Sequence, residues 1–484
     1  MSDFMQTGTI DISERVNGSV HFREEIEKEA QEKEKENRIL RTLLDQPLDD
    51  NGNATCVFER YSVAHNESVG WMFYNGTHWS TDGAGAAISQ AIVETLQARV
   101  MAAWQHEDQE RQNAVQGFCK PNRGKVQGCE YLLQSMAYVS LSEFDNSPDL
   151  LNCANGVVDL RTGEIEPHGP EQKNTYCSPV AYKPTADYAD WEEWLLDAVG
   201  DQKIVEWLQM AVGYSMTGCT YEDILFYIFG PTRSGKGLFT ETISSVLGHP
   251  LAQGVNFSTF TEKRSADNQN FDLAPLKAAR MVSASESNAY ERFNEAKVKA
   301  LTGNNQVSCA FKHKTHFNYY PQYKIWLSSN HPVNADPDDD AVWARIRVIE
   351  FPTSHLGKEN KSLRSKMRAP AYLEGVLAWA VEGAIKWYEL GSKGLVELES
   401  SRKSKQEQRD EQDNVQAWLD ECCKIDAGSF AANSKLYPAY RLWCEVNGVE
   451  AKKKKSLTLS LKKKGYEPHH NGSERGIKGF SITG

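Results

Sequence analysis

The sequence lacks the features that mark membrane-spanning, secreted and zinc-binding proteins. It has no stretch of about 18 or more apolar residues, and no positive N-terminal region followed by an apolar segment. Its ten cysteines are scattered, and no two of them form a Cys-x-x-Cys pair. We therefore expect a cytoplasmic protein with reduced, mostly buried thiols, without a membrane span, a disulfide framework or a zinc site.

No excess of basic charge is present either. The chain has 54 Lys and Arg against 66 Asp and Glu, a net charge of -12, which argues against a uniformly basic nucleic-acid coat but allows local basic patches. A composition of 25% charged and 40% hydrophobic residues is typical of a soluble globular protein. At 484 residues, the usual domain size predicts about three domains.

Turn residues and hydrophobic periodicity divide the chain into four regions. The start of the chain is dense in Glu and Lys, which indicates a solvated helix or tail. An Asn75-Gly76 hairpin turn, helical periodicity and later strand-and-turn alternation predict an α+β domain after it. Alternating strands and helices then favour an α/β core, and a polar run at 400–413 is expected to be a linker. The expected regions are a tail at 1–45, an α+β domain at 46–190, an α/β domain with a helical extension at 191–411, and a basic domain at 412–484.

A glycine-bounded loop that ends in a lysine follows a buried apolar strand at 224–229. The spacing from Gly230 to Gly235-Lys236 is typical of loops whose backbone N–H groups bind phosphates while the lysine reaches the terminal phosphates. Apolar residues at helical spacing follow, so a helix N-terminus would face the anion. The alternative is a glycine-rich turn between a core strand and a core helix. The residues predicted to bind the nucleotide are Gly230, Pro231, Thr232, Arg233, Ser234, Gly235, Lys236 and Gly237.

Three later strands carry polar residues suited to nucleotide hydrolysis. One ends in Glu286, and we expect this strand to lie beside the loop strand, where the acid can polarise water and help to hold Mg²⁺. The next strand ends at Asn330, whose amide can hydrogen-bond a γ-phosphate. Arg345 and Arg347 lie at the start of another strand, and a guanidinium delivered in trans stabilises transition-state charge.

Together with Lys299 to Gly303 and the Asn330-His331-Pro332 run, these motifs resemble the superfamily 3 helicase domain of phage and plasmid primase-helicases, which is related to the poxvirus NTPase. Residues 151–163 resemble the N-terminal module of these proteins, and residues 436–479 resemble their C-terminal winged-helix module. The resemblance implies an α/β fold: a P-loop AAA+-like core, preceded by an α+β domain and followed by a winged helix. It also implies a ring, commonly a homo-hexamer, that uses ATP and Mg²⁺ to translocate on single-stranded DNA.

Carried over by position, the resemblance assigns four catalytic roles. Lys236 becomes the phosphate lysine, Glu286 the water-activating acid and metal ligand, and Asn330 the sensor. Arg345 becomes the finger that reaches a neighbouring subunit, with Arg347 as the runner-up.

Two basic segments are candidate DNA contacts. Residues 307–317 stand where such helicases carry a hairpin into the central channel, and an exposed basic turn without a ligand is the alternative. In the last region, a helix capped by Ser456 and stopped by Gly465, followed by a hairpin with a turn at Asn471-Gly472, predicts a winged helix that binds duplex or origin DNA. A solvated lysine-rich face is the alternative there. The predicted DNA-binding residues are Lys312, His313, Lys314, Lys462, Lys463 and Lys464.

Three departures from the family pattern affect these expectations. Gly237 replaces the Ser or Thr that ligates Mg²⁺ in the general phosphate loop, so Thr240 or water would have to substitute. Asn304-Asn305 stands where relatives have Gly-Asp. The residues before the core show no Asp-x-Asp primase centre and no zinc-binding cysteines, so we expect a helicase without its own primase.

The sequence thus predicts an ATP-dependent replicative DNA helicase of a phage, plasmid or other mobile element, located in the bacterial host cytoplasm if it is phage-encoded. One alternative is a replication initiator that binds or melts an origin without processive unwinding. The other is a small-molecule phosphotransferase that uses the same loop. Strand displacement on a forked duplex separates the helicase from the initiator, and stimulation by DNA separates both from the phosphotransferase.

Overall fold

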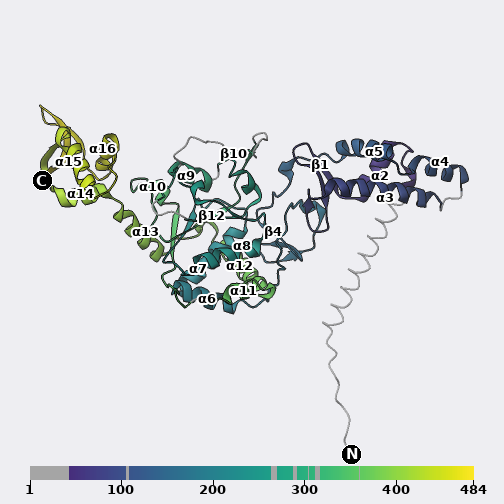
Figure 1. The fold of residues 1–484 in the computed structure, drawn as a ribbon, viewed down its shortest axis with the longest axis horizontal. Coiled ribbons are helices and arrows are strands. Elements are labelled where there is room, and N and C mark those ends of the chain that lie inside the picture. Colours follow the sequence, from purple (N-terminus) through teal and green to yellow (C-terminus); the bar gives the residue numbers. More distant parts are fainter. Residues whose placement is uncertain are drawn as a thin grey trace, which may run out of the picture. The chain divides into compact units, whose positions relative to one another are not determined.

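The computed structural model of the chain describes residues 43–104, 108–262, 270–286, 291–303, 305–310, 317–358 and 360–483. The chain divides into two compact units, which are described separately (Figure 1). The first unit extends to Asn146 and includes His168–Thr175, and the second comprises Ser147–Pro167 and the chain from Tyr176 onwards. The expected charged tail lies outside the described residues up to residue 42.

The first unit combines helices with a small antiparallel sheet, as the predicted α+β region requires. The hairpin predicted at Asn75-Gly76 is confirmed: Asn75 Oδ1 accepts hydrogen bonds from the backbone N–H groups of Thr77 and His78, both at 3.0 Å, and Gly76 has a φ of 99°. Arg99 is buried and donates to Asn53 Oδ1 at 2.7 Å. The elements are α2 (Asp50–Arg60), β1 (Val63–Asn66), β2 (Gly70–Tyr74), β3 (Trp79–Ser80), α3 (Ala84–Trp104), α4 (Gln109–Cys119), α5 (Arg123–Met136), η1 (Leu141–Glu143) and η2 (Pro170–Gln172).

The second unit is built on a five-stranded sheet with the order β13-β7-β12-β9-β8, in which every pair of neighbours is parallel. Successive side chains of β7 alternate between two hydrophobic cores: Phe226 and Ile228 pack into one, and Leu225 and Tyr227 into the other. Burial on both faces confirms the predicted parallel α/β core. The strands are β7 (Leu225–Phe229), β8 (Ala252–Gly254), β9 (Met281–Ser285), β12 (Lys324–Ser329) and β13 (Ile346–Glu350).

Helices of the second unit cover one face of the sheet and pack closely on one another. A Cβ on Gly213 would lie 2.0 Å from the backbone N of Ala384, and one on Gly383 would lie 1.9 Å from the carbonyl oxygen of Gln209, so α7 and α12 touch through their backbones. A small sheet at 150–166 packs into the same core, so the second unit includes residues that we expected in the preceding domain. These elements are β4 (Leu150–Cys153), β5 (Gly156–Asp159), β6 (Ile165–Glu166), α6 (Ala189–Val199), α7 (Gln202–Met216), α8 (Lys236–Leu247), α11 (Leu363–Lys366), α12 (Pro370–Leu390) and η5 (Gly391–Lys393).

The opposite face of the sheet is covered by short elements around the second core, which contains Leu276, Val298 and Trp343. None of the helices in the described part of the chain has the length and apolarity that a membrane crossing requires. The elements of this face are η3 (Phe257–Thr259), η4 (Ala274–Ala278), α9 (Glu295–Thr302), β10 (Val307–Cys309), β11 (Phe317–Tyr319) and α10 (Asp340–Trp343).

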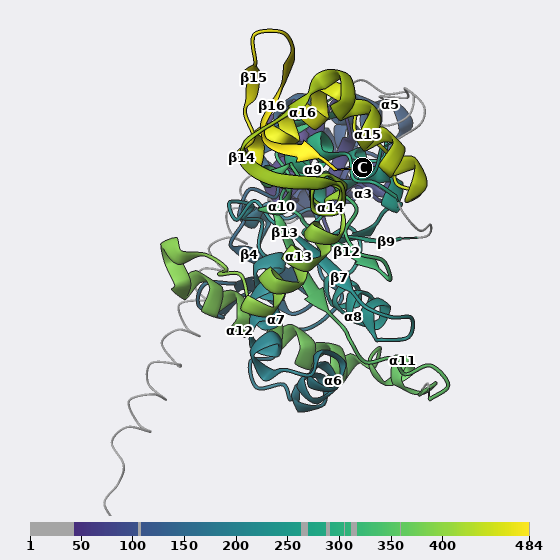
Figure 2. The same ribbon diagram turned by 90° about the vertical axis from the view of Figure 1, so that its left-hand side faces the viewer.

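The polar run at 400–413, which we predicted to be a linker, instead lies mainly in a packed helix, α13 (Glu399–Glu411). Its buried face is polar: Ser404 Oγ donates to Glu350, and Gln408 Oε1 accepts from the backbone N–H of Val333 at 2.9 Å. The linker prediction was wrong because the helix packs through polar side chains. It therefore has no apolar stripe in its sequence, and its hydrogen-bond partners are distant in the chain. In Figure 2, α13 leads into the C-terminal elements, which are coloured yellow.

The C-terminal elements form a small sheet with three helices around a core that includes Trp418, Tyr440 and Phe480. The helix predicted before Gly465 and the hairpin after it are present, but Ser456 lies inside the helix, whose N-cap is Lys453, so the predicted cap was wrong. We did not predict the first helix and strand of this group. The elements are α14 (Asn414–Cys422), β14 (Cys423–Ala432), α15 (Asn433–Val446), α16 (Lys454–Lys463), β15 (Pro468–His470) and β16 (Arg475–Ile482).

Candidate active site

The loop between β7 and α8 has a backbone that depends on its glycines. Gly230 has a φ of 154°, and a Cβ there would lie 2.2 Å from the carbonyl oxygen of Phe351. Gly235, the N-cap of α8, has a φ of 96°, which a residue with a side chain rarely adopts. The loop therefore leads directly into α8, and the N-terminus of this helix faces the loop. A helix N-terminus in this position favours the binding of an anion.

Lys236 closes this loop from the first position of α8. Its Nζ donates to the carbonyl oxygens of Gly230 and Pro231, both at 2.7 Å, to Ser234 Oγ at 3.2 Å and to Asn330 Oδ1 at 2.9 Å. Burial lowers the pKa of the Lys236 ammonium. The structure thus brings together the predicted phosphate lysine and the predicted sensor amide, which are 94 residues apart in the sequence.

The strand that carries Glu286 is not beside the loop strand, and this part of the prediction was wrong. The sheet order places β12 between β7 and β9, so the strand of Asn330 is the direct neighbour of the loop strand. All three strands are parallel, so Glu286, Asn330 and the loop still lie at the same edge of the sheet. Because β12 lies between them, the strand before the loop and the strand that carries Glu286 are two strand spacings apart. This separation is about 4.8 Å larger than that of two directly paired strands.

Glu286 is held by the end of β12. Its backbone N–H donates to the carbonyl oxygen of Ser328 at 2.9 Å, and its Oε2 accepts a hydrogen bond from Ser329 Oγ. Burial raises the pKa of the Glu286 carboxyl, and the Ser329 hydrogen bond opposes that rise. Sequence reasoning missed Ser329, because a serine at a strand end carries no distinctive pattern.

Arg345 lies at the amino ends of the parallel strands, opposite the carboxyl ends where the loop lies. Its carbonyl oxygen accepts from the backbone N–H of Leu225, the first residue of β7, so β7 itself separates Arg345 from the loop. At about 3.3 Å per residue, this five-residue strand spans roughly 15 Å. The Arg345 guanidinium donates to the carbonyl oxygen of Ala341 at 2.8 Å and lies 4.0 Å from Asp223. The structure does not bring Arg345 to the loop of its own chain.

Arg347, the runner-up for the same role, points back along the start of β13. Its Nη1 donates to the carbonyl oxygen of Ala344 at 2.7 Å, and burial lowers the pKa of its guanidinium. Arg347 pairs with Phe226 near the start of β7, so it too lies toward the amino ends of the strands, away from the loop that follows Phe229.

A segment just after β13 braces the loop. Ser354 Oγ donates to the carbonyl oxygen of Thr232 at 2.8 Å, and the backbone N–H of His355 donates to that of Arg233 at 3.1 Å. The His355 ring also lies 3.5 Å from the carboxylate of Asp197. These residues were not predicted, because only the pairing of β13 with β7 brings them to the loop.

The residues near Gly237 bear on how Mg²⁺ would be held. Gly237 is exposed, and a Cβ there would meet no atom within 4 Å. Thr240, the suggested substitute, is buried and donates its hydroxyl to the carbonyl oxygens of Lys236 and Gly237 at 3.3 and 3.1 Å. Within the described ranges, no cluster of three or more His, Cys, Asp or Glu could hold a metal. Mg²⁺ in nucleotide sites is usually held by one or two carboxylates together with phosphates and water, and Glu286 is a carboxylate of this kind at the loop end of the sheet.

The candidate DNA contacts are only partly described. β10 and β11 pair antiparallel, with Val307 opposite Tyr319, which confirms a hairpin at this place. Its tip, with Lys312, His313 and Lys314, lies outside the described residues, as does Asn304.

The three lysines at the end of α16 differ in their surroundings. Lys462 is exposed, whereas Lys463 Nζ donates to the carbonyl oxygen of Asp338 and Lys464 pairs with Asp413. Two of the three predicted DNA contacts therefore already have protein partners.

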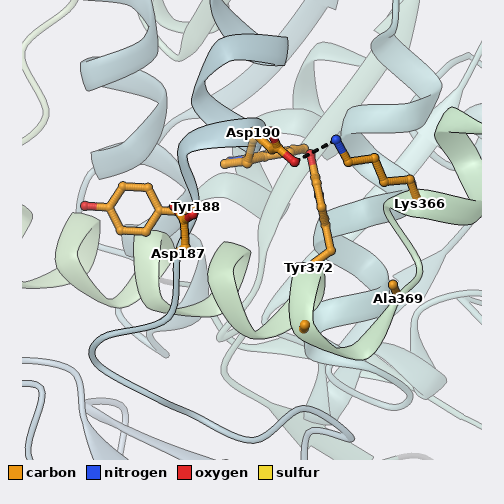
Figure 3. Close-up of a pocket in the computed structure, with 8 residues that line it drawn as sticks. Asp187, Tyr188, Asp190, Lys366, Ala369 and Tyr372 are labelled. Atoms are coloured by element: carbon orange, nitrogen blue, oxygen red, sulfur yellow. Dashed lines mark ion pairs between the residues drawn. The ribbon is translucent and has the colours of Figure 1, made fainter.

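Figure 3 shows a pocket of about 300 Å³ between α6, α11 and α12. The Lys366 ammonium lies 2.6 Å from the Asp190 carboxylate, and Tyr372 points from α12 toward this ion pair (Figure 3). Trp191, which also lines the pocket, stacks on Trp194, with ring centroids 5.2 Å apart. The sequence did not predict this pocket.

Comparison with known proteins gives two family matches. Residues 54–200 match the family described as D5 N terminal like, and residues 228–345 match a family of unknown function (DUF5906). The second match begins in β7 and ends at Arg345, so it contains all four predicted catalytic residues.

Two viral proteins are similar over part of their length. The chain is 24% identical over 216 residues to "Putative helicase L207/L206" of Acanthamoeba polyphaga mimivirus, covering 44% of this chain and 22% of that protein. It is 21% identical over 256 residues to "Putative helicase 121R" of Invertebrate iridescent virus 3, covering 51% and 27%. The chain thus spans about a quarter of the length of these relatives. Among solved structures, the apo NrS-1 C-terminal region aligns with a TM-score of 0.39 at 11% identity, over 64% of this chain and 80% of that one.

The parallel sheet, with its glycine loop and the acid, amide and lysine at one edge, is an α/β arrangement of the kind that the sequence motifs predicted. The D5 N terminal like match and the similarity to two viral proteins named as helicases support a relation of this chain to phage and viral primase-helicases.

Proposed function

We propose that the protein is an ATP-dependent DNA helicase that acts in the replication of a phage, virus or other mobile element. The observation that carries the proposal is the meeting of Lys236, Asn330 and Glu286 beside the loop at one edge of the sheet. A lysine for phosphates, an amide for the γ-phosphate and an acid for water are the groups that phosphoryl transfer to water needs. The similarity to viral proteins named as helicases supports the same assignment.

In the proposed reaction, the backbone N–H groups of the loop and the N-terminus of α8 bind the phosphates of ATP. Lys236 exchanges its carbonyl and Asn330 partners for phosphate oxygens, and Asn330 turns to the γ-phosphate. The Glu286 carboxylate accepts a proton from the attacking water. Bound Mg²⁺, for which Glu286 is the protein ligand that fits, would neutralise charge on the phosphates.

The position of Arg345 supports hydrolysis between subunits. Because the guanidinium lies at the sheet edge opposite its own loop, it can complete a site only on a neighbouring chain. Such a head-to-tail contact generates a closed ring when its rotation closes, and a homo-hexamer is the proposed form. An exposed apolar side chain lies near each of the two surfaces that would meet in this contact. Beside the loop, Leu356 follows His355 and is 67% exposed. Beside Arg345, Tyr221 precedes Asp223 by two residues and is 60% exposed.

We assign DNA contact to two places. Single-stranded DNA would pass through a central channel lined by the β10–β11 hairpin with Lys312, His313 and Lys314. The C-terminal group, read as a winged helix, would bind duplex or origin DNA through the lysines at the end of α16.

The test is unwinding of a forked duplex with Lys236→Ala beside the matched variant Lys203→Ala, which removes an exposed lysine from α7. We expect Lys236→Ala to abolish both ATP turnover and strand release, because the phosphate lysine is lost, and Lys203→Ala to retain both. Turnover retained by Lys236→Ala would refute the loop assignment. ATP hydrolysis without strand release in the unmodified protein would refute the helicase and favour the initiator.

A further inference from the structure

Ser329 stands between the two charged groups of the candidate site. It is the last residue of β12, the strand that separates β7 from β9, and its side chain is 3% exposed. Its neighbour Asn330 accepts from Lys236, while Ser329 itself donates to Glu286. Two consecutive residues of one strand end therefore hold both the lysine and the acid.

The backbone just beyond Ser329 fixes the place of its hydroxyl. Ser329 Oγ accepts from the backbone N–H of His331 at 2.8 Å, and it also lies 3.0 Å from the carbonyl oxygen of His331. That carbonyl accepts from Tyr227 Oη at 2.9 Å. Since Tyr227 belongs to β7, a chain of hydrogen bonds connects the strand that enters the loop to the carboxylate of Glu286.

The hydroxyl has one proton and two acceptors within reach, Glu286 Oε2 and the carbonyl oxygen of His331. An ionised carboxylate is the stronger acceptor, so the proton lies on the Glu286 side while Glu286 is charged. When Glu286 takes up a proton, its O–H can donate to Ser329 Oγ, and the serine proton then turns to His331. This arrangement satisfies both protonation states but adds a charge-assisted hydrogen bond only to the ionised one.

We infer that Ser329 is a positioning residue for Glu286: its hydroxyl, fixed by the backbone N–H of His331, holds one carboxylate oxygen and so orients the carboxylate toward the attacking water. The inference rests on the proposed ATPase function.

The first test compares kcat and KM for ATP hydrolysis in Ser329→Ala, Ser329→Thr and Ser328→Ala. Ser328 is a buried serine of the same strand whose side chain points to the opposite face of the sheet. Without the Ser329 hydroxyl the Glu286 carboxylate is no longer held in place, so we expect Ser329→Ala to lower kcat and to leave KM for ATP unchanged. We expect Ser329→Thr to restore kcat, because it keeps the hydroxyl, and Ser328→Ala to leave kcat unchanged. A Ser329→Ala variant with unchanged kcat, or one in which KM rises while kcat is kept, would overturn the inference.

The second test needs no hydrolysis. Thermal unfolding is compared for Ser329→Ala, Glu286→Ala and the double variant at a pH where Glu286 is ionised. If the hydroxyl holds the carboxylate, the double variant differs from the sum of the two single variants. Additive effects would overturn the contact. Coupling in a protein without ATPase activity would instead refute the proposed function and leave the Ser329–Glu286 interaction established.

Discussion

At the residue scale, the charged groups of the site are already engaged by protein atoms. Lys236 has four acceptors, of which three belong to the loop itself, so the lysine holds the loop in shape. The fourth, Asn330, belongs to β12 and makes the lysine sensitive to movement of that strand. Exchange of these neutral acceptors for phosphate oxygens gives stronger, charge-assisted bonds.

A residue-scale prediction concerns the missing hydroxyl at Gly237. The position is exposed and has room for a Cβ, so Gly237→Ser should fold normally and place an oxygen one residue after Lys236, where phosphate loops usually ligate Mg²⁺. We expect the Mg²⁺ concentration for half-maximal ATPase activity to fall in Gly237→Ser. Gly237→Ala is the matched control, because it changes the backbone in the same way without the hydroxyl. Equal metal dependence of the two variants would contradict the prediction.

At the element scale, local signals and long-range contacts separate what the sequence could predict from what it could not. The strands ending at Phe229, Ser285 and Ser329 were predictable because each is a short run rich in apolar or small residues that ends at a turn residue or a polar residue. The insertion of β12 between β7 and β9 was not, since strand order depends on packing between segments about 40 to 100 residues apart. Helix α13 was misread for the same reason: its buried polar face has partners more than 50 residues away.

The contact of α7 with α12 gives an element-scale prediction. A methyl group on Gly383 would collide with the carbonyl oxygen of Gln209, so Gly383→Ala must push the two helices apart. Overpacking of this kind typically costs about 1–3 kcal/mol. We expect thermal unfolding to show a lower Tm for Gly383→Ala, whereas Gly237→Ala, in the same unit with open space around it, should not lower it. An unchanged Tm in Gly383→Ala would show that the helices adjust freely.

At the scale of the whole molecule, the residues to which we assign catalytic roles lie at opposite ends of the strands of the central sheet. The loop, Glu286 and Asn330 lie at the carboxyl ends, and Arg345 lies at the amino end of β13. Under the proposed function, each chain holds one half of a site at each end of the strands, and neighbouring chains combine these halves. Assembly is then a condition for hydrolysis.

The measurement that tests this central claim most directly is ATP hydrolysis in mixtures of Lys236→Ala and Arg345→Ala proteins, each inactive alone. In a mixed ring, the intact loop of an Arg345→Ala subunit meets the intact arginine of a Lys236→Ala subunit. We expect mixing to restore part of the activity, and the restored activity to depend on the ratio of the two proteins. Mixtures that remain as inactive as the separate variants would contradict it and place the action of Arg345 within its own chain.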